Sequence, residues 1–457
     1  RAMIRSVAAF TLCLAAVAGP PVRPQSEPWQ AVSLPSGKIL FEPPAGAFLS
    51  DLNAFPINSA VSPNGRFVAF LNNGFGHPSS GFRKSIAVFD RVTRQLSDTP
   101  EPGTGLAFNG PTNISTTYYG IAFSSDGSRL YVSIASTKKD PVLGDRTQNG
   151  IRVYRLGDRG LTPDGAIPIP PSRIPFPAGV RLNNPAPTPS GISVAADPRN
   201  PGEDLIYAAL TLSDAAVELS TKTRSVVRVF DLHLNPKHPA IPAEYPYATA
   251  LCPRGRTLYV SLHNGSAVAA VDLASGKAVL LPVGRQQGFA SSPSSHPGHL
   301  LASPSGDAVY VAVENSDLVA VIENDPSSPG YRRVVSELDV RPPEMREMGI
   351  LGAGPNHLTF SPDGRILLVC LGTLNAVAVV EVSSNGVGGA PRHEIKGYLP
   401  TLWYPHTAEV SADGRTIYLT SGKAKGTGSN RPQLPFDPGL QPGPYGPTLL
   451  KGSLHEI

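Results

Sequence analysis

Short apolar segments alternate with polar turns along almost the whole chain. In the clearest example, residues 356–369, an apolar segment is followed by the turn 361–364 and then by a second apolar run. The proline of this turn fixes φ, its aspartate can bond to nearby backbone, and its glycine tolerates a positive φ. The aliphatic and β-branched residues on both sides suit buried strands better than a helix. The pattern therefore predicts a β-hairpin.

The same hairpin recurs along the sequence. Six copies are clear, with turns at residues 62–65, 125–127, 252–255, 303–306, 361–364 and 411–414, and a seventh at 196–207 has a longer turn. A third apolar run follows most copies, and a fourth often follows that. Four strands per unit, repeated at roughly fifty residues, are typical of the blades of a β-propeller.

A sheet that is apolar on both faces must be covered by its neighbours, so the units are expected to stack around a closed ring. We therefore predict an all-β fold, a seven-bladed β-propeller of four-stranded antiparallel blades. An open solenoid and a two-sheet sandwich are the alternatives. The short apolar run at residues 38–41 precedes the first complete unit. We expect it to complete the last blade when the ring closes.

Composition agrees with a chain of many turns. The 49 prolines and 45 glycines are spread between the predicted strands and do not form one tract, which argues against disorder. The formal net charge is only +4 in 457 residues, and lysine and arginine are scattered. This distribution gives no basic patch for nucleic acid, and we predict no nucleic-acid partner.

The N-terminal residues have the pattern of an export signal. Arg5 precedes an apolar run at 7–15 and small residues at 16–18. We predict a signal peptide over residues 1–18, followed by a proline-rich linker over 19–32; a buried apolar strand is the alternative. The run is too short to span a membrane, so no membrane span is expected. The predicted location is periplasmic or extracellular.

Two cysteines, Cys252 and Cys370, follow the predicted signal peptide. They fall in the fourth and sixth predicted blades, so we expect no disulfide between them even in an oxidising compartment. Both are expected to be buried as small hydrophobic residues.

The turns and the strands that follow them resemble the YVTN family of β-propeller repeats. The resemblance is greatest at 56–65 with 72–76, at 398–405 with 418–423, and at 449–454. These segments are similar to exported bacterial proteins in which a YVTN propeller precedes a phosphoesterase domain of the alkaline-phosphatase type. The resemblance implies a propeller over residues 33–425. It also implies that the Pro/Gly-rich segment and final strand, 426–457, lead into a C-terminal domain missing from this sequence.

The metal-dependent hydrolytic residues of that family belong to the domain expected after residue 457. No catalytic residue, metal ligand or cofactor is therefore assigned to this chain, and whether it is an enzyme stays open.

Candidate binding residues come from the predicted innermost strands, which line the channel of a propeller. The first residues of each such strand lie at the channel mouth, and counting back from each turn identifies them. Seven of them carry amide, phenol or imidazole groups suited to a small ligand or an extended peptide: Asn58, Tyr119, Tyr247, His299, Asn356, His357 and His406.

Three of these histidines, His299, His357 and His406, belong to consecutive predicted blades. Three converging imidazoles can hold a metal with an open position for water. The alternative is that they line the channel as polar residues bonded to water or backbone. The neighbouring pair Trp403 and Tyr404 either packs on another domain or fills a blade interface.

Three functional hypotheses follow. The first is a non-catalytic binding or scaffold domain whose partner is another protein or an attached phosphoesterase domain. The second is a self-contained lactonase-like hydrolase at the channel mouth, since YVTN rings are similar to that family. The third is a stand-alone exported interaction scaffold.

Overall fold

The computed structural model describes residues 32–33, 39–40, 47–52, 55–72, 85–100, 116–135, 149–157, 160–183, 185–235, 238–252, 256–285, 294–383, 391–423 and 452–457. The predicted signal peptide (1–18), linker (19–32, apart from Val32) and the segment 426–451 lie outside these residues. Within them, no helix is long and apolar enough to cross a membrane.

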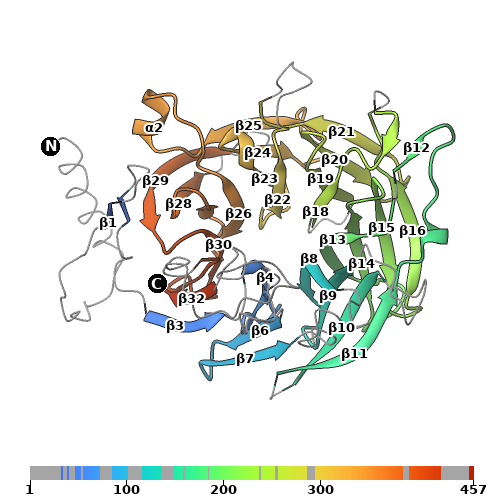
Figure 1. The fold of residues 1–457 in the computed structure, drawn as a ribbon, viewed down its shortest axis with the longest axis horizontal. Coiled ribbons are helices and arrows are strands. Elements are labelled where there is room, and N and C mark those ends of the chain that lie inside the picture. The colour runs from blue at the N-terminus through green and yellow to red at the C-terminus, as the bar shows by residue number, and fades with distance from the viewer. Residues whose placement is uncertain are drawn as a thin grey trace, which may run out of the picture.

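Seven four-stranded antiparallel sheets surround a common axis, which confirms the predicted seven-bladed propeller (Figure 1). We number the blades 1 to 7 in chain order. Blade 1 consists of β4 (Pro56–Val61), β5 (Phe67–Asn72), β6 (Ser85–Asp90) and β7 (Gln95–Pro100). Blade 2 consists of β8 (Thr116–Phe123), β9 (Arg129–Ala135), β10 (Gly150–Gly157) and β11 (Gly160–Pro168). Blade 3 consists of β13 (Pro189–Ala196), β14 (Asp204–Leu210), β15 (Ala215–Ser220) and β16 (Ser225–Asp231).

The second half of the ring repeats this plan. Blade 4 consists of β18 (Pro246–Leu251), β19 (Thr257–Leu262), β20 (Ala267–Asp272) and β21 (Ala278–Pro282). Blade 5 consists of β22 (Pro297–Ala302), β23 (Ala308–Val313), β24 (Leu318–Glu323) and β25 (Val334–Asp339). Blade 6 consists of β26 (Pro355–Phe360), β27 (Ile366–Leu371), β28 (Ala376–Ser383) and β29 (Arg392–Pro400).

Blade 7 closes the ring with strands from both ends of the described chain. Its inner strands are β30 (Pro405–Val410) and β31 (Ile417–Ser421), followed outward by β32 (Gly452–Glu456) and β3 (Ala47–Leu52). The prediction that residues 38–41 close the ring is therefore wrong. Ile39–Leu40 form the two-residue strand β2, which pairs with β1 (Val32–Ser33), whereas β3 offers six residues to the blade edge. The propeller also extends beyond residue 425, because β32 lies inside blade 7.

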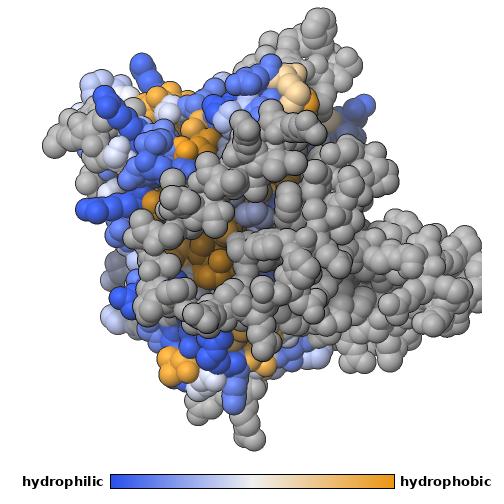
Figure 2. Space-filling model, turned by 90° about the vertical axis from the view of Figure 1, so that its left-hand side faces the viewer, coloured by the Kyte–Doolittle hydropathy of each residue, from blue (hydrophilic) through white to orange (hydrophobic). Residues whose placement is uncertain are grey.

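A few short elements connect the blades. They are the pair β12 (Arg181–Leu182) and β17 (Ala240–Ile241), the 3₁₀ turns η2 (Pro171–Arg173) and η3 (Glu314–Ser316), and the helix α2 (Pro343–Glu347). On the side of the ring in Figure 2 the described residues are mostly hydrophilic, with hydrophobic residues in separate patches. The outer strand β29 is typical, because its exposed and half-buried positions alternate.

Among the described residues the hydrophobic core is divided into seven clusters, one at each blade–blade interface. Strand β23 shows how the sequence produces this division. Its residues Ala308, Tyr310 and Ala312 pack against blade 6, and Val309, Val311 and Val313 pack against blade 4. A middle strand is therefore apolar at every position because successive side chains point to opposite, equally buried faces.

The recurring turn has a repeated polar structure. In blade 1 the hydroxyl of Ser62 donates to Asn64 Oδ1 at 2.7 Å and accepts from the N–H of Phe67 at 2.9 Å. The turn glycine, Gly65, has a φ of 70°, and φ is also positive at the glycine of the other clear copies whose turns the structure describes. Cys252 and Cys370 are buried and free, as expected.

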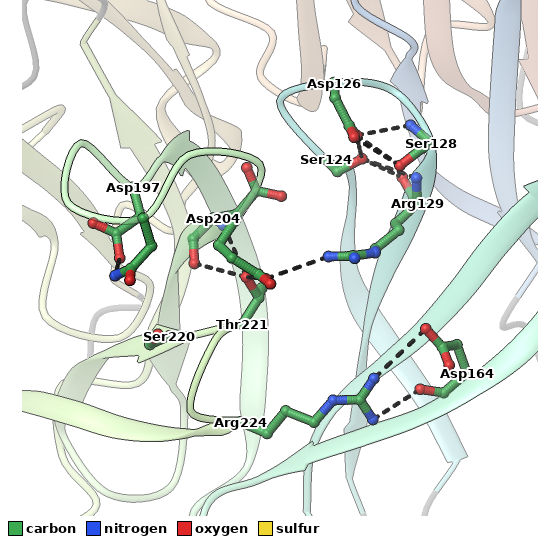
Figure 3. A network of polar contacts seen from close by, with 12 residues as sticks. Ser124, Asp126, Ser128, Arg129, Asp164, Asp197, Asp204, Ser220, Thr221 and Arg224 are labelled. Carbon is green, nitrogen blue, oxygen red and sulfur yellow. Dashed lines mark hydrogen bonds and ion pairs between the residues drawn. The ribbon is translucent and has the colours of Figure 1, made fainter.

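Polar contacts also join neighbouring blades. Figure 3 shows such a network between blades 2 and 3, in which Arg224 contacts Asp164. The buried carboxylate of Asp204 accepts from Ser125 Oγ at 2.5 Å and from the Tyr131 hydroxyl at 2.7 Å. These ionisable groups are paired within the chain and hold two sheets together.

Candidate functional site

The seven innermost strands meet around the channel, and all seven begin with an irregularity (Figure 1). Register shifts occur within the first residues of β4, β8, β13, β18, β22, β26 and β30. Six of these strands begin with proline, which has no N–H to give to the ladder. A bulge re-aims the side chains next to it, and bulges are frequent beside active sites. The predicted binding residues lie at these bulges.

Residues just outside the inner strands form a rim around the channel mouth. In each of blades 3 to 7 the inner strand begins with proline, and the residue before this proline has a carbonyl that accepts one hydrogen bond. The donor is the N–H of the residue that follows the second strand of the same blade. The donor–acceptor pairs are Thr211 and Thr188, His263 and Tyr245, Glu314 and His296, Gly372 and Gly354, and Gly422 and Tyr404.

Three rim residues before proline have an unusual backbone. Tyr245, His296 and Tyr404 have φ values of 53°, 52° and 61°. Positive φ is uncommon for bulky residues, and a following proline normally favours extended backbone. Gly354 holds the equivalent position in blade 6 with a φ of 61°, so this conformation is one that glycine adopts freely.

The rim conformation is held by side chains of the preceding blade. Asp317 of blade 5 accepts from the N–H groups of Gly352 at 2.8 Å, Ala353 at 2.7 Å and Gly354 at 3.2 Å. Asp214 of blade 3 does the same for the residues leading to Tyr245, and Asn375 of blade 6 accepts from the N–H of Tyr404. The rim is therefore positioned from one blade to the next.

Two of the rim aromatic rings lie over glycines. A Cβ added to Gly372 would stand 3.0 Å from Cζ of Tyr404, and one added to Gly422 would stand 2.3 Å from Cε2 of Phe55. Phe55 also lies near Tyr404 and His406, with ring centroids 5.6 Å and 5.3 Å away. The absence of a side chain at these glycines makes room for the rings.

The structure brings the predicted histidines together. His299 and His357 stack with their ring centroids 4.2 Å apart, and Nδ1 of His299 accepts from the N–H of Leu358 at 3.2 Å. Burial lowers the pKa of His299 and of His406 to about 4, and burial together with the other two imidazoles lowers the pKa of His357 well below its usual value. All three are therefore neutral at neutral pH.

These imidazoles do not form the metal site that their spacing suggested. Within the described ranges, no group of three or more histidine, cysteine, aspartate or glutamate side chains could hold a metal ion. The alternative, in which the histidines line the channel as polar residues bonded to water or backbone, stays a prediction.

The predicted tyrosines also converge. Tyr119 of blade 2 and Tyr247 of blade 4 have ring centroids 4.4 Å apart, although blade 3 lies between them in the ring. Gly191 of blade 3 permits this approach, because a Cβ there would stand 2.6 Å from Cα of Ala248. Beyond Tyr247, the aromatic series continues through His263 to His296, which stack at 4.2 Å.

The two predicted asparagines make contacts between blades. Nδ2 of Asn58 donates to the carbonyl of Tyr119 at 3.1 Å, and Nδ2 of Asn356 donates to the carbonyl of Pro405 at 3.1 Å. These amides therefore join adjacent inner strands. Ligand binding by the seven predicted residues stays a prediction.

Several buried polar atoms of the inner strands have no hydrogen-bond partner among the described residues. They are Ser190 Oγ, Asn356 Oδ1, His357 Nδ1 and His406 Nδ1. Leaving such groups unsatisfied costs about 1–3 kcal/mol each, so their clustering near one channel mouth calls for an explanation.

A carboxylate completes the mouth. Glu314, the residue after β23, has Oε1 3.2 Å from where a Cβ on Gly298 would stand. Burial raises the pKa of Glu314 to about 7. Glu314 therefore exists in both protonation states near neutral pH.

The opposite end of the channel differs. Glu409 accepts there from Ser59 Oγ at 2.6 Å and from Thr359 Oγ1 at 3.2 Å, and so joins blades 1, 6 and 7. It borders a cavity of about 340 Å³ that is also lined by Arg91. The Arg91 guanidinium donates to the carbonyls of Gly65 and Val410. Both charged groups are thus engaged in structural contacts.

Counting back from the turns identified residues of the inner strands but none of the rim. Glu314, Phe55, Tyr245 and His296 were not singled out, and Tyr404 was noted only as part of an aromatic pair. The sequence holds a signal for four of them, because Phe55, Tyr245, His296 and Tyr404 all immediately precede the recurring proline. Glu314 has no such signal, since only the folded blade places the end of β23 beside the start of β22.

No protein-family model matches this sequence, and comparison with curated proteins gave no match. Among solved structures, this chain is similar to streptogramin B lyase, with a TM-score of 0.51, 14% identity, and coverage of 90% of this chain and 97% of that chain. A catalytically inactive variant of virginiamycin B lyase from Staphylococcus aureus with quinupristin gives a TM-score of 0.50, 15% identity, and coverage of 90% and 99%. The periplasmic gluconolactonase of Pseudomonas aeruginosa gives 0.49 and 17%, covering 76% and 85%.

The likeness to the two lyases shows a shared fold and nothing more. At such low identity it says nothing of the chemistry at the channel mouth, which rests on this chain's own residues. The YVTN resemblance and the attached phosphoesterase domain stay predictions.

Proposed function

We propose that this chain is a ligand-binding propeller domain whose site is the channel mouth built by the rim and the first residues of the inner strands. The observation that carries the proposal is the backbone of Tyr245, His296 and Tyr404, which have positive φ before proline at a place where Gly354 fits without strain. Strain of this kind persists mainly at functional sites, where it holds side chains in place.

The unpartnered polar atoms at Ser190, Asn356, His357 and His406 support the same proposal. A bound molecule with hydrogen-bonding groups would satisfy them, and the surrounding aromatic rings would cover its apolar part. The neutral state of the histidines allows each ring to donate at one nitrogen and accept at the other.

Crystals soaked separately in acetamide and in phenol test the site directly. We expect acetamide within hydrogen-bond distance of Asn356, His357 or His406, and phenol against Tyr119 and Tyr247. The variant Asn356→Leu should lose the acetamide, while Gln95→Leu, at an exposed residue of the outer strand β7, should keep it. Probe molecules found only elsewhere on the surface would show that the mouth is not a binding site.

Acid–base chemistry at the mouth is a second candidate, favoured by Glu314. Its pKa near 7 lets one carboxyl group both accept and donate a proton close to neutral pH. A lactonase-like hydrolase then predicts hydrolysis of glucono-1,5-lactone that falls at least a hundredfold in Glu314→Gln. No turnover above the uncatalysed rate would exclude this candidate for that substrate.

The wider role follows from the YVTN resemblance. We propose an exported domain, periplasmic or extracellular, that serves as a scaffold for a protein partner or for an attached phosphoesterase domain. An in-frame continuation of the gene that encodes clustered aspartate and histidine residues would support the attached domain. Recovery of the mature chain only from the cytoplasmic fraction would contradict export.

A further inference from the structure

The carboxylate of Glu314 is placed at the mouth without a partner of its own. It lies against Gly298, where any side chain would compete with Oε1 for space. Within the part of the chain that the structure describes, this carboxylate has no hydrogen bond and no ion pair, and burial alone accounts for the rise of its pKa. An acid in such surroundings is available to a positively charged ligand.

Three tyrosines from different blades surround the carboxylate at electrostatic range. Burial raises the pKa of Tyr119, Tyr247 and Tyr404, and the nearby charge of Glu314 raises each of them further. These residues come from blades 2, 4 and 7, whereas Glu314 belongs to blade 5. The charge of Glu314 therefore acts on tyrosines of three other blades, and two of these, Tyr119 and Tyr247, have ring centroids 4.4 Å apart.

Two histidines at the mouth do not supply a competing positive charge. Burial lowers the pKa of His263 and His299 to about 4, so these imidazoles are neutral at neutral pH. The described cation at the rim is Lys423, whose Nζ lies 5.1 Å from the centre of the Tyr404 ring. This contact shows that an ammonium group fits against an aromatic face at the rim.

We infer that the ligand of the channel mouth carries an organic ammonium group, held by the carboxylate of Glu314 and by the faces of the surrounding tyrosines. This inference rests on the proposed binding function. Aromatic faces attract an ammonium group through their negative π-surface, and a partly desolvated carboxylate strengthens the attraction. A metal ion is a poorer fit, because the described residues offer no cluster of three ligands.

Choline and 3,3-dimethyl-1-butanol make a matched pair of probes, since they have the same shape and differ only by the positive charge. We expect isothermal titration calorimetry of the full chain at pH 8 to show choline bound at least about tenfold more tightly, as one or two cation–π contacts would give. Equal affinities would overturn the ammonium inference yet leave the binding site intact. Absence of acetamide and phenol from the mouth would overturn the site itself.

The variant Glu314→Gln keeps the shape and removes the charge. It should weaken choline binding about tenfold and leave the neutral probe unchanged, while Glu347→Gln, on the exposed helix α2, should change neither. Unchanged choline binding in Glu314→Gln would overturn the role of the carboxylate. Thermal unfolding of each variant confirms that it is folded.

The variant Lys423→Met distinguishes a cationic ligand from an anionic one. In Lys423→Met, choline should bind as tightly as before or more tightly, because the lysine ammonium no longer occupies the face of Tyr404. Loss of choline binding in this variant, or binding of acetate that depends on Lys423, would overturn the inference of a cationic ligand.

Discussion

The residues of the rim present polar and aromatic side chains to the channel, although three of them need an unfavourable backbone conformation. Tyr245, His296 and Tyr404 accept a positive φ that glycine adopts more easily. The glycines at 298, 372 and 422 have no side chain, and this leaves room for Glu314, Tyr404 and Phe55. Both devices place polar and aromatic groups at one end of the channel.

Glu314 should leave a signature in the pH dependence of stability. Its pKa is about 7 in the folded chain and 4.5 ordinarily, so between these values the folded state binds more protons than the unfolded state. The stabilisation is complete below about pH 4.5 and is lost as the pH rises through 7. Measured by urea unfolding, wild type should lose stability relative to Glu314→Gln across this window.

Comparing the stability of wild type with that of Glu314→Gln isolates the effect of this carboxyl group. The mouth histidines act in the opposite direction, because their lowered pKa values make stability fall as the pH drops from 6.5 toward 4, but they do so equally in both proteins. Unfolding free energies that stay parallel from pH 4.5 to 7.5 would contradict the raised pKa.

At the scale of elements, the turns between the second and third strands connect each blade to the next. Asp317 binds three backbone N–H groups of the segment that leads into blade 6, and Ala353 among them is fully buried. We expect Asp317→Ala to lower the free energy of unfolding by about 3 kcal/mol, because it leaves buried donors unsatisfied. Urea unfolding measures the change.

The variant Asp317→Asn is the matched control for this prediction. It keeps an oxygen acceptor, and asparagine tolerates the positive φ of 56° found at this position. Its loss should be clearly smaller than that of Asp317→Ala. Equal losses would mean that the charge, and not the hydrogen bonds, stabilises the connection.

Tyrosines of the second strands form another set of contacts between blades. The hydroxyl of Tyr131 donates to the buried carboxylate of Asp204 at 2.7 Å, whereas that of Tyr310 lies 3.1 Å from Nε2 of His393. Hydrogen bonds to charged groups contribute more than neutral ones. Tyr131→Phe should therefore cost about 2–3 kcal/mol and Tyr310→Phe about 1 kcal/mol in urea unfolding; the reverse order would refute this ranking.

The strands and their number could be predicted because each blade repeats the same local signals. The turn at 361–364 and the apolar run after it predict a hairpin without reference to the rest of the chain. The closing strand could not be found this way, because residues 39–40 and 47–52 are both short extended segments and only pairing with β32 distinguishes them. Glu314 escaped prediction for the same reason, since its neighbours are distant in sequence.

At the scale of the whole molecule, stability depends on ring closure through blade 7. A chain that begins at residue 46 keeps β3, whereas a chain that begins at residue 54 exposes the edge of β32. We expect the longer chain to unfold in one cooperative transition like the full chain, and the shorter one to aggregate or to lose cooperativity. Size-exclusion chromatography and urea unfolding distinguish the two.

The two truncations differ by only eight residues, so they form a matched pair. Identical behaviour of both chains would show that β3 is dispensable for closing the ring. In that case blade 7 would have to be stable with the three strands β30, β31 and β32.

The pairing of β3 with β32 also determines when folding can finish. Strand β3 is the first strand of the ring to be synthesised, and β32 is the last. During synthesis the blades can therefore form only an open arc with two uncovered apolar faces. The two uncovered faces of this arc are the surfaces through which incompletely folded chains would associate.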